Sequence, residues 1–410
     1  MSATDTEPVF FNPLEPGYVE SPHAHLAEMR EGDPVHKSLI DNWILFAYDD
    51  VFRLLRDPAL SVDDAKADMT NSERIDMFES VAAELGTELE PNRSILNVDP
   101  PDHTRLRKLV SKAFTPGSIE ALRPSIQEMV DDALDRIAAA GQADVIDELA
   151  FPLPFDVITE MLGMPRGDVD QIRDWSEAIV KTLDPIISEE EFADALRADI
   201  NMSAHIAEVI ETKRSNPGDD LLTRMIEAEE GGDRMSATEL KDQVSLLFIA
   251  GHETTVNLIG TGIYELLRNP DQLQLLLDDP SLISGAVDEL LRFVSPVQFS
   301  RRITTSDVEY GGRTIPKGQF VLACLSSANR DPGKFGPTAD QLDITRSDAG
   351  QLLSLGSGAH YCLGASLAKL EAQIAIGSFV ERFGQVDVVE ADFNGRINLR
   401  GLGRLEVNVG

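Results

Sequence analysis

One cysteine stands where the sequence can make its sulfur reactive. Cys362 follows the glycine-rich residues 355–361 (LGSGAHY), and an apolar-periodic segment that predicts a helix begins directly after it. At or just before a helix N-terminus, free backbone N–H groups and the helix dipole favour a thiolate over a thiol. The other cysteine, Cys324, lies in an apolar run typical of a buried strand. Cys362 is therefore better suited to bind a metal than to form a disulfide.

A second set of reactive residues lies in a segment that should be deeply buried. Residues 244–267 are apolar on nearly every side, which is typical of a helix inside a large core. In its middle, Glu253 and Thr254 place a carboxyl and a hydroxyl side by side. Such groups are costly to bury unless they serve each other, a ligand or ordered water. We interpret the neighbouring His252 as a histidine that is satisfied within the helix rather than as a ligand.

These two segments resemble the cytochrome P-450 family of haem-thiolate monooxygenases. The family signature Phe-Gly-x-Gly-x-His-x-Cys-x-Gly is matched at every position except the first, where Leu355 replaces the aromatic residue. The family motif Ala-Gly-x-(Asp/Glu)-Thr is matched by residues 250–254 without departure. The resemblance implies that the chain binds haem b and that Cys362 is the axial ligand of its iron.

The resemblance also assigns roles to the residues beside these motifs. Gly364 near the cysteine, and Ala250 and Gly251 in the buried helix, have little or no side chain and let the chain pass close to a flat cofactor. Thr254 would hydrogen-bond dioxygen in the site, and Glu253 would relay protons from solvent. We therefore expect the three small residues to bind the cofactor, and Glu253 and Thr254 to be catalytic.

Four basic residues match family positions that bind the haem propionates. Residues 99–102 (DPPD) open a predicted helix on which His103 and Arg107 share a face, one turn apart. In isolation such a pair is most often a solvated basic face. Arg302, with Arg301 as the fallback, and His360 complete the expected set.

A further pair of charges is expected to be structural. Glu289 and Arg292 stand three residues apart on an apolar helix, which indicates that the pair is buried rather than a surface salt bridge. The resemblance to the family's Glu-x-x-Arg motif implies a buried charge network, which we expect Arg346 to complete. Removing one member would leave an uncompensated charge, and should abolish folding or haem incorporation.

The expected substrate pocket is mostly aliphatic and does not identify the substrate. For Ile95 and Ile397 an ordinary role in the core is an equal alternative. Macrolides, terpenoids, steroids and fatty acids all remain open. The expected pocket residues are Ile95, Leu246, Ala250, Val294, Val297, Gln298 and Ile397.

Composition bounds the class of protein. The 410 residues are 42% hydrophobic, and 36 Lys+Arg against 71 Asp+Glu give a net charge of −35. This charge argues against nucleic acid and against an anionic membrane surface as partners. Residues 1–7 show no basic region followed by an apolar run, and two unpaired cysteines suit a reducing compartment. We expect a cytoplasmic protein.

The predicted fold is mainly α-helical with a small β subdomain, and residues 1–410 form one haem domain. Residues 62–95 are polar and irregular, and in the family form a mobile loop over the pocket. The pattern predicts strands at 43–47 and 320–325 and a hairpin over 308–318. It predicts helices over 49–56, 118–140, 155–162, 169–183, 190–214 and 221–229.

Two other motifs are rejected. Residues 252–256 begin like the zinc-protease helix His-Glu-x-x-His, but Val256 cannot bind a metal. Gly356 and Gly358 resemble a dinucleotide loop, but Tyr361 occupies the place of the third glycine.

The implied reaction is oxidation, most simply hydroxylation, of a lipophilic small molecule with O2 and two electrons. The chain shows no flavin or iron–sulfur motif, so we expect a ferredoxin and an NAD(P)H-dependent ferredoxin reductase as partners. Local cations would overcome the repulsion between two acidic proteins. A peroxide-driven peroxygenase is one alternative, but such members dispense with the acid–alcohol pair. A non-catalytic haem-binding sensor or carrier is another. The expected docking cations are Arg105, Lys108, Lys112 and Lys369.

Overall fold

The computed structural model describes residues 10–68, 73–88, 91–112, 114–165, 169–228 and 234–410. Residues 1–7 and residue 229, on which two of the predictions fall, lie outside these ranges. Among the described residues, no helix is both long enough and apolar enough to cross a membrane.

Helices make up most of the described chain. The α-helices are α1 His23–Gly32, α2 Tyr48–Arg56, α3 Glu73–Glu84, α4 Asp102–Ser111, α5 Pro116–Glu120, α6 Arg123–Ala140, α7 Pro152–Leu162, α8 Val169–Val180, α9 Glu189–Ser215, α10 Leu221–Glu227, α11 Ala237–Arg268, α12 Pro270–Asp278, α13 Ile283–Val294, α14 Leu325–Ala328, α15 Pro332–Phe335 and α16 Ala365–Phe383. Shorter helical turns are η1 Asp64–Lys66, η2 Ile146–Ala150, η4 Lys181–Leu183, η5 Pro280–Leu282, η6 Ala349–Gln351 and η7 Gly358–His360.

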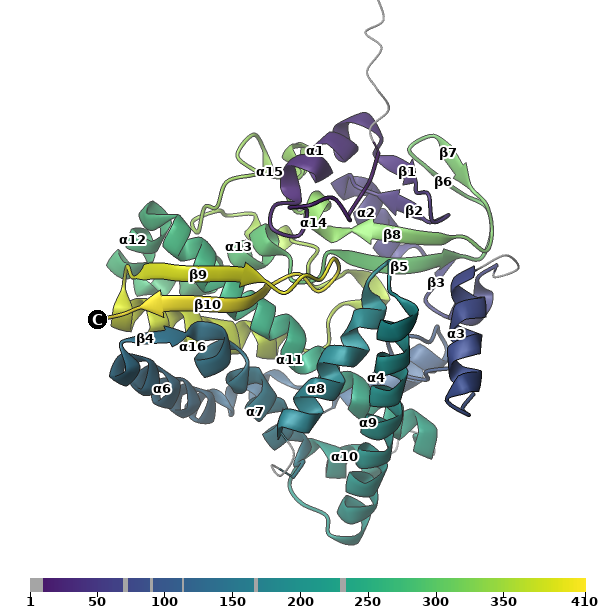
Figure 1. The fold of residues 1–410 in the computed structure, drawn as a ribbon, viewed down its shortest axis with the longest axis horizontal. Coiled ribbons are helices and arrows are strands. Elements are labelled where there is room, and N and C mark those ends of the chain that lie inside the picture. The colour runs from purple at the N-terminus through teal and green to yellow at the C-terminus, as the bar shows by residue number, and fades with distance from the viewer. Residues whose placement is uncertain (1–9, 69–72, 89–90, 113, 166–168, 229–233) are drawn as a thin grey trace, which may run out of the picture.

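The strands form small sheets at the edges of the helical body. A five-stranded sheet has the order β1-β2-β8-β5-β3, a three-stranded sheet has the order β4-β10-β9, and β6 pairs with β7. In Figure 1 the five-stranded sheet and α1 occupy the upper part of the view, and α8, α9 and α10 the lower part. The strands are β1 Val35–Lys37, β2 Trp43–Leu45, β3 Leu60–Ser61, β4 Gln142–Asp144, β5 Phe299–Thr304, β6 Val308–Tyr310, β7 Arg313–Ile315, β8 Phe320–Cys324, β9 Asp387–Phe393 and β10 Leu402–Asn408.

The mainly helical fold with a small β subdomain is confirmed, but two local predictions were wrong. The helix expected over 118–140 is two helices, α5 and α6, because Pro124 stands in the first turn of α6. Proline has no N–H and clashes with the preceding turn, so it starts a helix and does not continue one.

The segment 62–95, expected to be irregular, contains helix α3. Its polar composition concealed an apolar stripe. The ring of Phe78 stacks on that of Phe192 in α9, with their centroids 3.7 Å apart, and Val81 and Ala82 on the next turn are buried. These positions recur at the helical spacing of three and four residues.

The central helix of the core is α11, which contains the acid and the threonine. It starts with a capping box between Ser236 and Glu239, and its middle belongs to the largest hydrophobic cluster. Gly260 and Gly262 let neighbours come close: a Cβ would lie 2.3 Å from Ile146 at the first and 3.1 Å from Ile376 at the second. Small residues therefore fix how η2 and α16, the helix after the cysteine, pack on α11.

Candidate haem site

The cysteine loop is held by tight turns. Gly356 and Gly358 have φ angles of +71° and +72°, a left-handed conformation that favours glycine. A Cβ at Gly358 would lie 3.0 Å from the carbonyl oxygen of Leu55, so the loop packs directly against the end of α2. The N–H of Cys362 donates to the carbonyl of Leu355 at 2.8 Å. The backbone therefore fixes the position of the cysteine.

The protein alone does not favour a thiolate at Cys362, contrary to the expectation from the sequence. Helix α16 begins at Ala365, three residues later. Burial raises the pKa of the Cys362 thiol, and the N–H of Gly364 and the charge of Arg107 oppose this only in part. A coordinated metal ion deprotonates a thiol outright, so the thiolate would come from the iron rather than from the helix N-terminus.

Four basic side chains gather beside this loop. The ring of His103 lies 4.2 Å from that of His360 between centroids, and Arg107 donates to the carbonyl of Tyr361 at 2.6 Å. Burial lowers the pKa of His360 to about 3, with the charges of His103, Arg302 and Arg107 acting in the same direction. The structure thus brings together the four predicted residues from three distant segments.

The charges in this group suit an anionic ligand. Burial lowers the pKa of Arg302 to about 10, and only Asp99 opposes this. Asp99 itself is paired with Lys66 at 2.5 Å. The Nε2 atom of His103 is buried and finds no hydrogen-bond partner among the described residues. Two propionate groups would supply the missing negative charge and an acceptor.

The structure distinguishes Arg302 from its fallback. The Arg302 guanidinium is buried and donates to the carbonyl of Arg301 at 2.7 Å. The side chain of Arg301 is 43% exposed and forms an ion pair with Asp64 on η1. The burial pattern of β5 therefore turns Arg302 inward and Arg301 toward solvent.

Two positions in the predicted cofactor-binding segments leave open space beside the backbone. A Cβ at Gly364 would meet nothing within 4 Å. Ala250 is exposed although it lies in the middle of the otherwise buried α11, and Thr254, one turn later, is half-buried. The residues present therefore fit a haem held between the cysteine loop and this face of α11.

Gly251 also has a role in packing, and its contact with the cofactor stays a prediction. A Cβ at Gly251 would lie 3.3 Å from the Ile158 side chain of α7. This glycine therefore lets α7 pack closely on α11. In a helix, adjacent positions are about 100° apart, so a Cβ at Gly251 would point in a different direction from that of Ala250.

Glu253 and Thr254, the predicted catalytic pair, are not joined by a hydrogen bond in the structure. The Thr254 hydroxyl donates to the carbonyl of Ala250 at 3.0 Å. The carboxyl of Glu253 lies 3.2 Å from Arg396, 3.4 Å from the Ser176 hydroxyl and 3.5 Å from Nε2 of His252. Glu253 thus has its own set of partners and is only 8% exposed.

These partners set the charge of the acid. Burial alone would raise the pKa of Glu253, but a hydrogen bond and charge from His252, the charge of Arg396 and a hydrogen bond from Ser176 together lower it. Arg396 lies 143 residues away in the turn between β9 and β10. Sequence reasoning missed Arg396 and Ser176, because no local pattern links them to Glu253.

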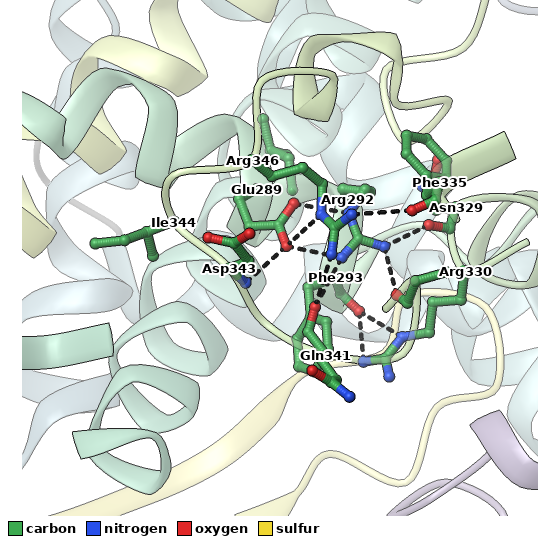
Figure 2. Close-up of polar contacts among 12 residues, drawn as sticks. Glu289, Arg292, Phe293, Asn329, Arg330, Phe335, Gln341, Asp343, Ile344 and Arg346 are labelled. Carbon is green, nitrogen blue, oxygen red and sulfur yellow. Dashed lines mark hydrogen bonds and ion pairs between the residues drawn. The ribbon is translucent and has the colours of Figure 1, made fainter. Parts of the chain in front are cut away.

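Glu289 and Arg292 form a fully buried ion pair on α13 (Figure 2). The two Arg292 nitrogens Nε and Nη2 donate to the two carboxylate oxygens of Glu289, each at 2.7 Å. Nη1 donates to the carbonyls of Asn329 and Ala339 at 2.6 and 2.7 Å. Arg346 reaches the same carboxylate at 3.1 Å. The three predicted charges meet in one network.

Asn329 connects this network to the cysteine loop. Besides the bond from Arg292 to its carbonyl, its side chain donates to the hydroxyls of Ser295 and Ser354 and accepts from the N–H of Leu353 at 2.7 Å. Leu353 and Ser354 directly precede the loop. The network therefore fixes the start of the cysteine segment, a role the sequence did not reveal.

The expected substrate-pocket residues do not form one group. Ile95 and Leu246 belong to the same small apolar cluster, and the N–H of Ile95 faces Gln243 of α11 at 3.3 Å. Val294 lies in the main core, and Val297 packs on the cluster under the five-stranded sheet. Ile397 packs with Phe11, Tyr18 and Phe299 in a further cluster, which favours its alternative role in the core.

Gln298 is buried and hydrogen-bonds to its own segment. Its side-chain amide donates to the carbonyls of Val294 and Ser295, at 3.3 and 2.5 Å. The amide thus caps the end of α13, and a contact with substrate stays a prediction.

A cavity of about 650 Å³ lies between α4 and the cysteine loop. None of the expected substrate-pocket residues lines it. Of the expected docking cations, Lys108 and Lys112 do. The other two are held elsewhere: Lys369 pairs with Asp288 at 2.6 Å, and Arg105 pairs with Glu239. The lining residues are His103, Thr104, Arg107, Lys108, Ser111, Lys112 and Ala359.

A cysteine loop beside clustered basic residues, in a chain whose buried central helix carries an acid and a threonine, suits a haem-thiolate protein. The comparison with known proteins agrees: the family model described as Cytochrome P450 matches residues 63–279 and 276–393. The chain belongs to the cytochrome P450 family.

Individual relatives cover nearly the whole chain. Cytochrome P450 107B1 of Saccharopolyspora erythraea is 42% identical over 97% of this chain and 97% of its own length. The vitamin D(3) 25-hydroxylase of Pseudonocardia autotrophica is 40% identical, with coverage of 95% and 94%. The crystal structure of P450BioI in complex with an acyl carrier protein ligated to hexadec-9Z-enoic acid has a TM-score of 0.87 at 32% identity, covering 96% of this chain and 99% of that one. The protein is thus a haem-dependent monooxygenase that acts on lipophilic molecules.

Proposed function

We propose that the cofactor is haem b, ligated by Cys362. The observation that carries this proposal is the group of four basic side chains, with the unpartnered Nε2 of buried His103, directly beside the cysteine loop. Haem b carries two free propionates and no covalent bond to the chain, which suits a site of hydrogen-bond donors. Arg107 and Arg302 would pair with the propionate charges, and His103 and His360 would donate to their oxygens.

Bound haem iron supplies dioxygen activation and oxygen transfer to the substrate. Two protons are consumed for each oxygen molecule, and the chain's own residues must deliver them. We infer that Thr254, on the face that carries Ala250, holds the proton nearest the reacting oxygen. Glu253 behind it takes protons from solvent. The carboxylate must turn from Arg396 toward Thr254 in each cycle, because the present geometry joins it to other partners.

A ferredoxin with its NAD(P)H-dependent reductase is the proposed electron donor. The cavity between α4 and the cysteine loop carries Arg107, Lys108 and Lys112 on its walls, a local basic surface on a protein of net charge −35. Ferredoxins are acidic, so this surface would steer their approach. Lys108→Glu with Lys112→Glu should raise the apparent KM for ferredoxin without changing substrate binding. An unchanged KM would contradict this docking site.

The substrate is proposed to be a long or polycyclic, mainly apolar molecule, oxidised in the cytoplasm. Relatives with similar chains are named for vitamin D3 or solved with a fatty acid on a carrier protein. The candidates for the pocket are almost all aliphatic. Two free cysteines suit a reducing compartment. Secosteroids, fatty acids, macrolides and terpenoids are the compounds to screen for the spectral shift that accompanies entry of a substrate.

The difference spectrum of the reduced protein with and without carbon monoxide tests the proposal. A Soret band far to the red of imidazole-ligated haem, lost in Cys362→Ala, is the expected result. A band at the ordinary imidazole position would show that another residue binds the iron. Folded protein that takes up no haem would overturn the proposed function.

A further inference from the structure

A fully buried histidine lies directly behind the catalytic acid. His252 precedes Glu253 on α11 and is 0% exposed. Its ring has rings of Phe151, Phe155 and Phe248 around it at centroid distances of 5.3 to 6.0 Å. The Nε2 edge of the ring is not covered by these aromatic rings, and it faces Glu253. The reaction described above does not use this histidine.

The hydrogen bonds of the ring fix its tautomer. Nδ1 lies 2.8 Å from the carbonyl oxygen of Phe248, one turn earlier. A carbonyl can only accept, so Nδ1 must carry a proton. In the neutral ring Nε2 is then an acceptor. Its neighbours are the Ser176 hydroxyl of α8 at 3.2 Å and Oε1 of Glu253 at 3.5 Å.

Ser176, His252 and Glu253 have too few protons among them to give each acceptor a hydrogen bond. The Ser176 hydroxyl has one proton and two acceptors within reach, Nε2 of His252 and Oε1 of Glu253, the latter at 3.4 Å. Arg396 serves only the other carboxylate oxygen, Oε2, at 3.2 Å. With neutral His252 and ionised Glu253, either Nε2 or Oε1 therefore faces the other without a proton between them. The cluster has room for one more proton.

The charges around the cluster leave it able to take up this proton. Arg396 offsets the charge of Glu253, so the four-residue cluster is neutral before the proton enters. Beyond it on α8, Arg173 lies over the Phe151 ring at 3.9 Å and pairs with Glu177 at 3.0 Å.

The remaining neighbours supply no competing site next to the ring. Asp147 of η2 pairs with Arg173 at 3.3 Å, and Asp184 lies beside the turn that carries Arg396. Burial raises the pKa of Asp184, with Arg396 opposing. The residues of α7 and of the Phe248 turn that face the ring are aromatic.

We propose that His252 is a positioning and proton-holding residue behind Glu253, which binds the additional proton at Nε2 and passes it to the carboxylate. The N–H bond at Nε2 breaks, an O–H bond forms at Oε1, and His252 returns to its neutral Nδ1–H tautomer. Glu253 then carries the proton toward Thr254. The proton that reloads Nε2 comes from solvent through the Ser176 hydroxyl, 3.2 Å away, which gives its proton to Nε2 and takes another in its place; Arg396 stays protonated and holds only Oε2 of Glu253. The inference rests on the proposed role of Glu253.

Nitrogen-15 spectra of histidine-labelled holoprotein test it directly. The ferrous carbonyl form is diamagnetic, and the seven histidines include His252, assigned by its loss in His252→Gln. We expect the Nδ1–H tautomer at high pH, and protonation of Nε2 on lowering the pH while the protein stays folded. An Nε2–H tautomer, or a ring that never gains the second proton, would overturn the proposal. Ser176→Ala should change this titration. His205→Gln, which removes a half-buried histidine of α9, should not.

Turnover with two oxidants separates proton delivery from damage to the site. Dioxygen needs two electrons and two protons from outside, whereas hydrogen peroxide brings both with it. In His252→Gln we expect oxygen-driven product formation to fall about tenfold and to lose its dependence on pH, while the peroxide-driven rate is kept. Equal losses with both oxidants, or none with either, would refute the role. A normal carbon monoxide spectrum in the same variant keeps the proposed function separate from this outcome.

Discussion

Two buried ion pairs, one on α13 and one between α11 and the turn before β10, are built differently. Glu289 and Arg292 on α13 are both 0% exposed and are joined by two parallel hydrogen bonds of 2.7 Å. Glu253 on α11 and Arg396 are joined by one contact of 3.2 Å, at 10% and 13% exposure of their side chains. The first pair has bidentate geometry, which is the strong form of this interaction.

The partners around each pair explain the difference. The carboxylate of Glu289 also accepts from Arg346 and from the N–H of Asp343, so every proton near it belongs to a permanent donor. The Glu253 carboxylate instead lies within reach of one serine hydroxyl that His252 can also accept from. One pair holds the cysteine segment in place, and we propose that the other is loose enough to move a proton. Substitutions in each of the two regions can test this comparison.

The largest effect is expected from Arg292→Leu. The substitution leaves Glu289 buried with a weaker partner and removes the donors to the carbonyls of Asn329 and Ala339. Breaking a buried pair typically costs about 3–5 kcal/mol of unfolding free energy. Urea denaturation and the haem content of the purified protein would measure this. Arg404→Gln, in an exposed pair with Glu390, is the control and should leave both unchanged.

Thr254→Val should separate chemistry from stability. It removes the hydroxyl but keeps the shape of a half-buried side chain, so the denaturation midpoint should move little. Oxygen-driven product formation should fall about a hundredfold, with reducing equivalents diverted to hydrogen peroxide. Product and peroxide per NAD(P)H consumed give the measurement. A loss of stability as large as that of Arg292→Leu would contradict the view that α13 stabilises the protein and that the Thr254 region of α11 acts in the chemistry.

Arg396→Gln should change how the stability of the protein depends on pH in the acid range. The folded pKa of Glu253 is lowered, so its ionised form stabilises the protein above the unfolded pKa, and this stabilisation is lost as the pH falls through the folded pKa. Removing the arginine removes one of the lowering causes. The acid limb starts at the unfolded pKa, which the substitution does not change, so in the variant it should be smaller and should end at a higher pH than in the wild type. Thermal melts across the acid range would detect the shift, and an unchanged limb would show that Arg396 does not set the charge of Glu253.

The sequence predicted the parts of the site that act locally. The cysteine loop, the buried acid helix and the Glu-x-x-Arg pair are short patterns, and the structure places them on a tight loop, on α11 and on α13. Gly251 shows the limit of this reasoning, because a motif does not state which face of the helix each member occupies. The chemistry of Cys362 shows another, because burial outweighs the helix N-terminus in setting its pKa.

The residues that the sequence did not reveal act across long distances in the chain. Ser176, Arg396 and Asn329 carry ordinary side chains in unremarked segments, and their roles arise only when α8, the C-terminal turn and the loop after α14 meet their partners. The predicted pocket residues stay a prediction for the same reason. Their apolar side chains lie in four separate clusters, and an apolar residue near a motif suits a core cluster as well as a pocket.

The smallest expected effects come from two glycines that the motifs treat alike. Gly364→Ala should leave the free energy of unfolding of the haem-free protein within about 1 kcal/mol of the wild type, because a Cβ there meets nothing within 4 Å. Its affinity for haem should fall if the cofactor lies against this backbone. Gly251→Ala should keep the haem affinity but gain less stability than an alanine normally brings to a helix, because Ile158 must shift from a 3.3 Å contact. Haem titration of both refolded variants measures the difference. The reverse result would show that Gly251, and not Gly364, lies against the cofactor.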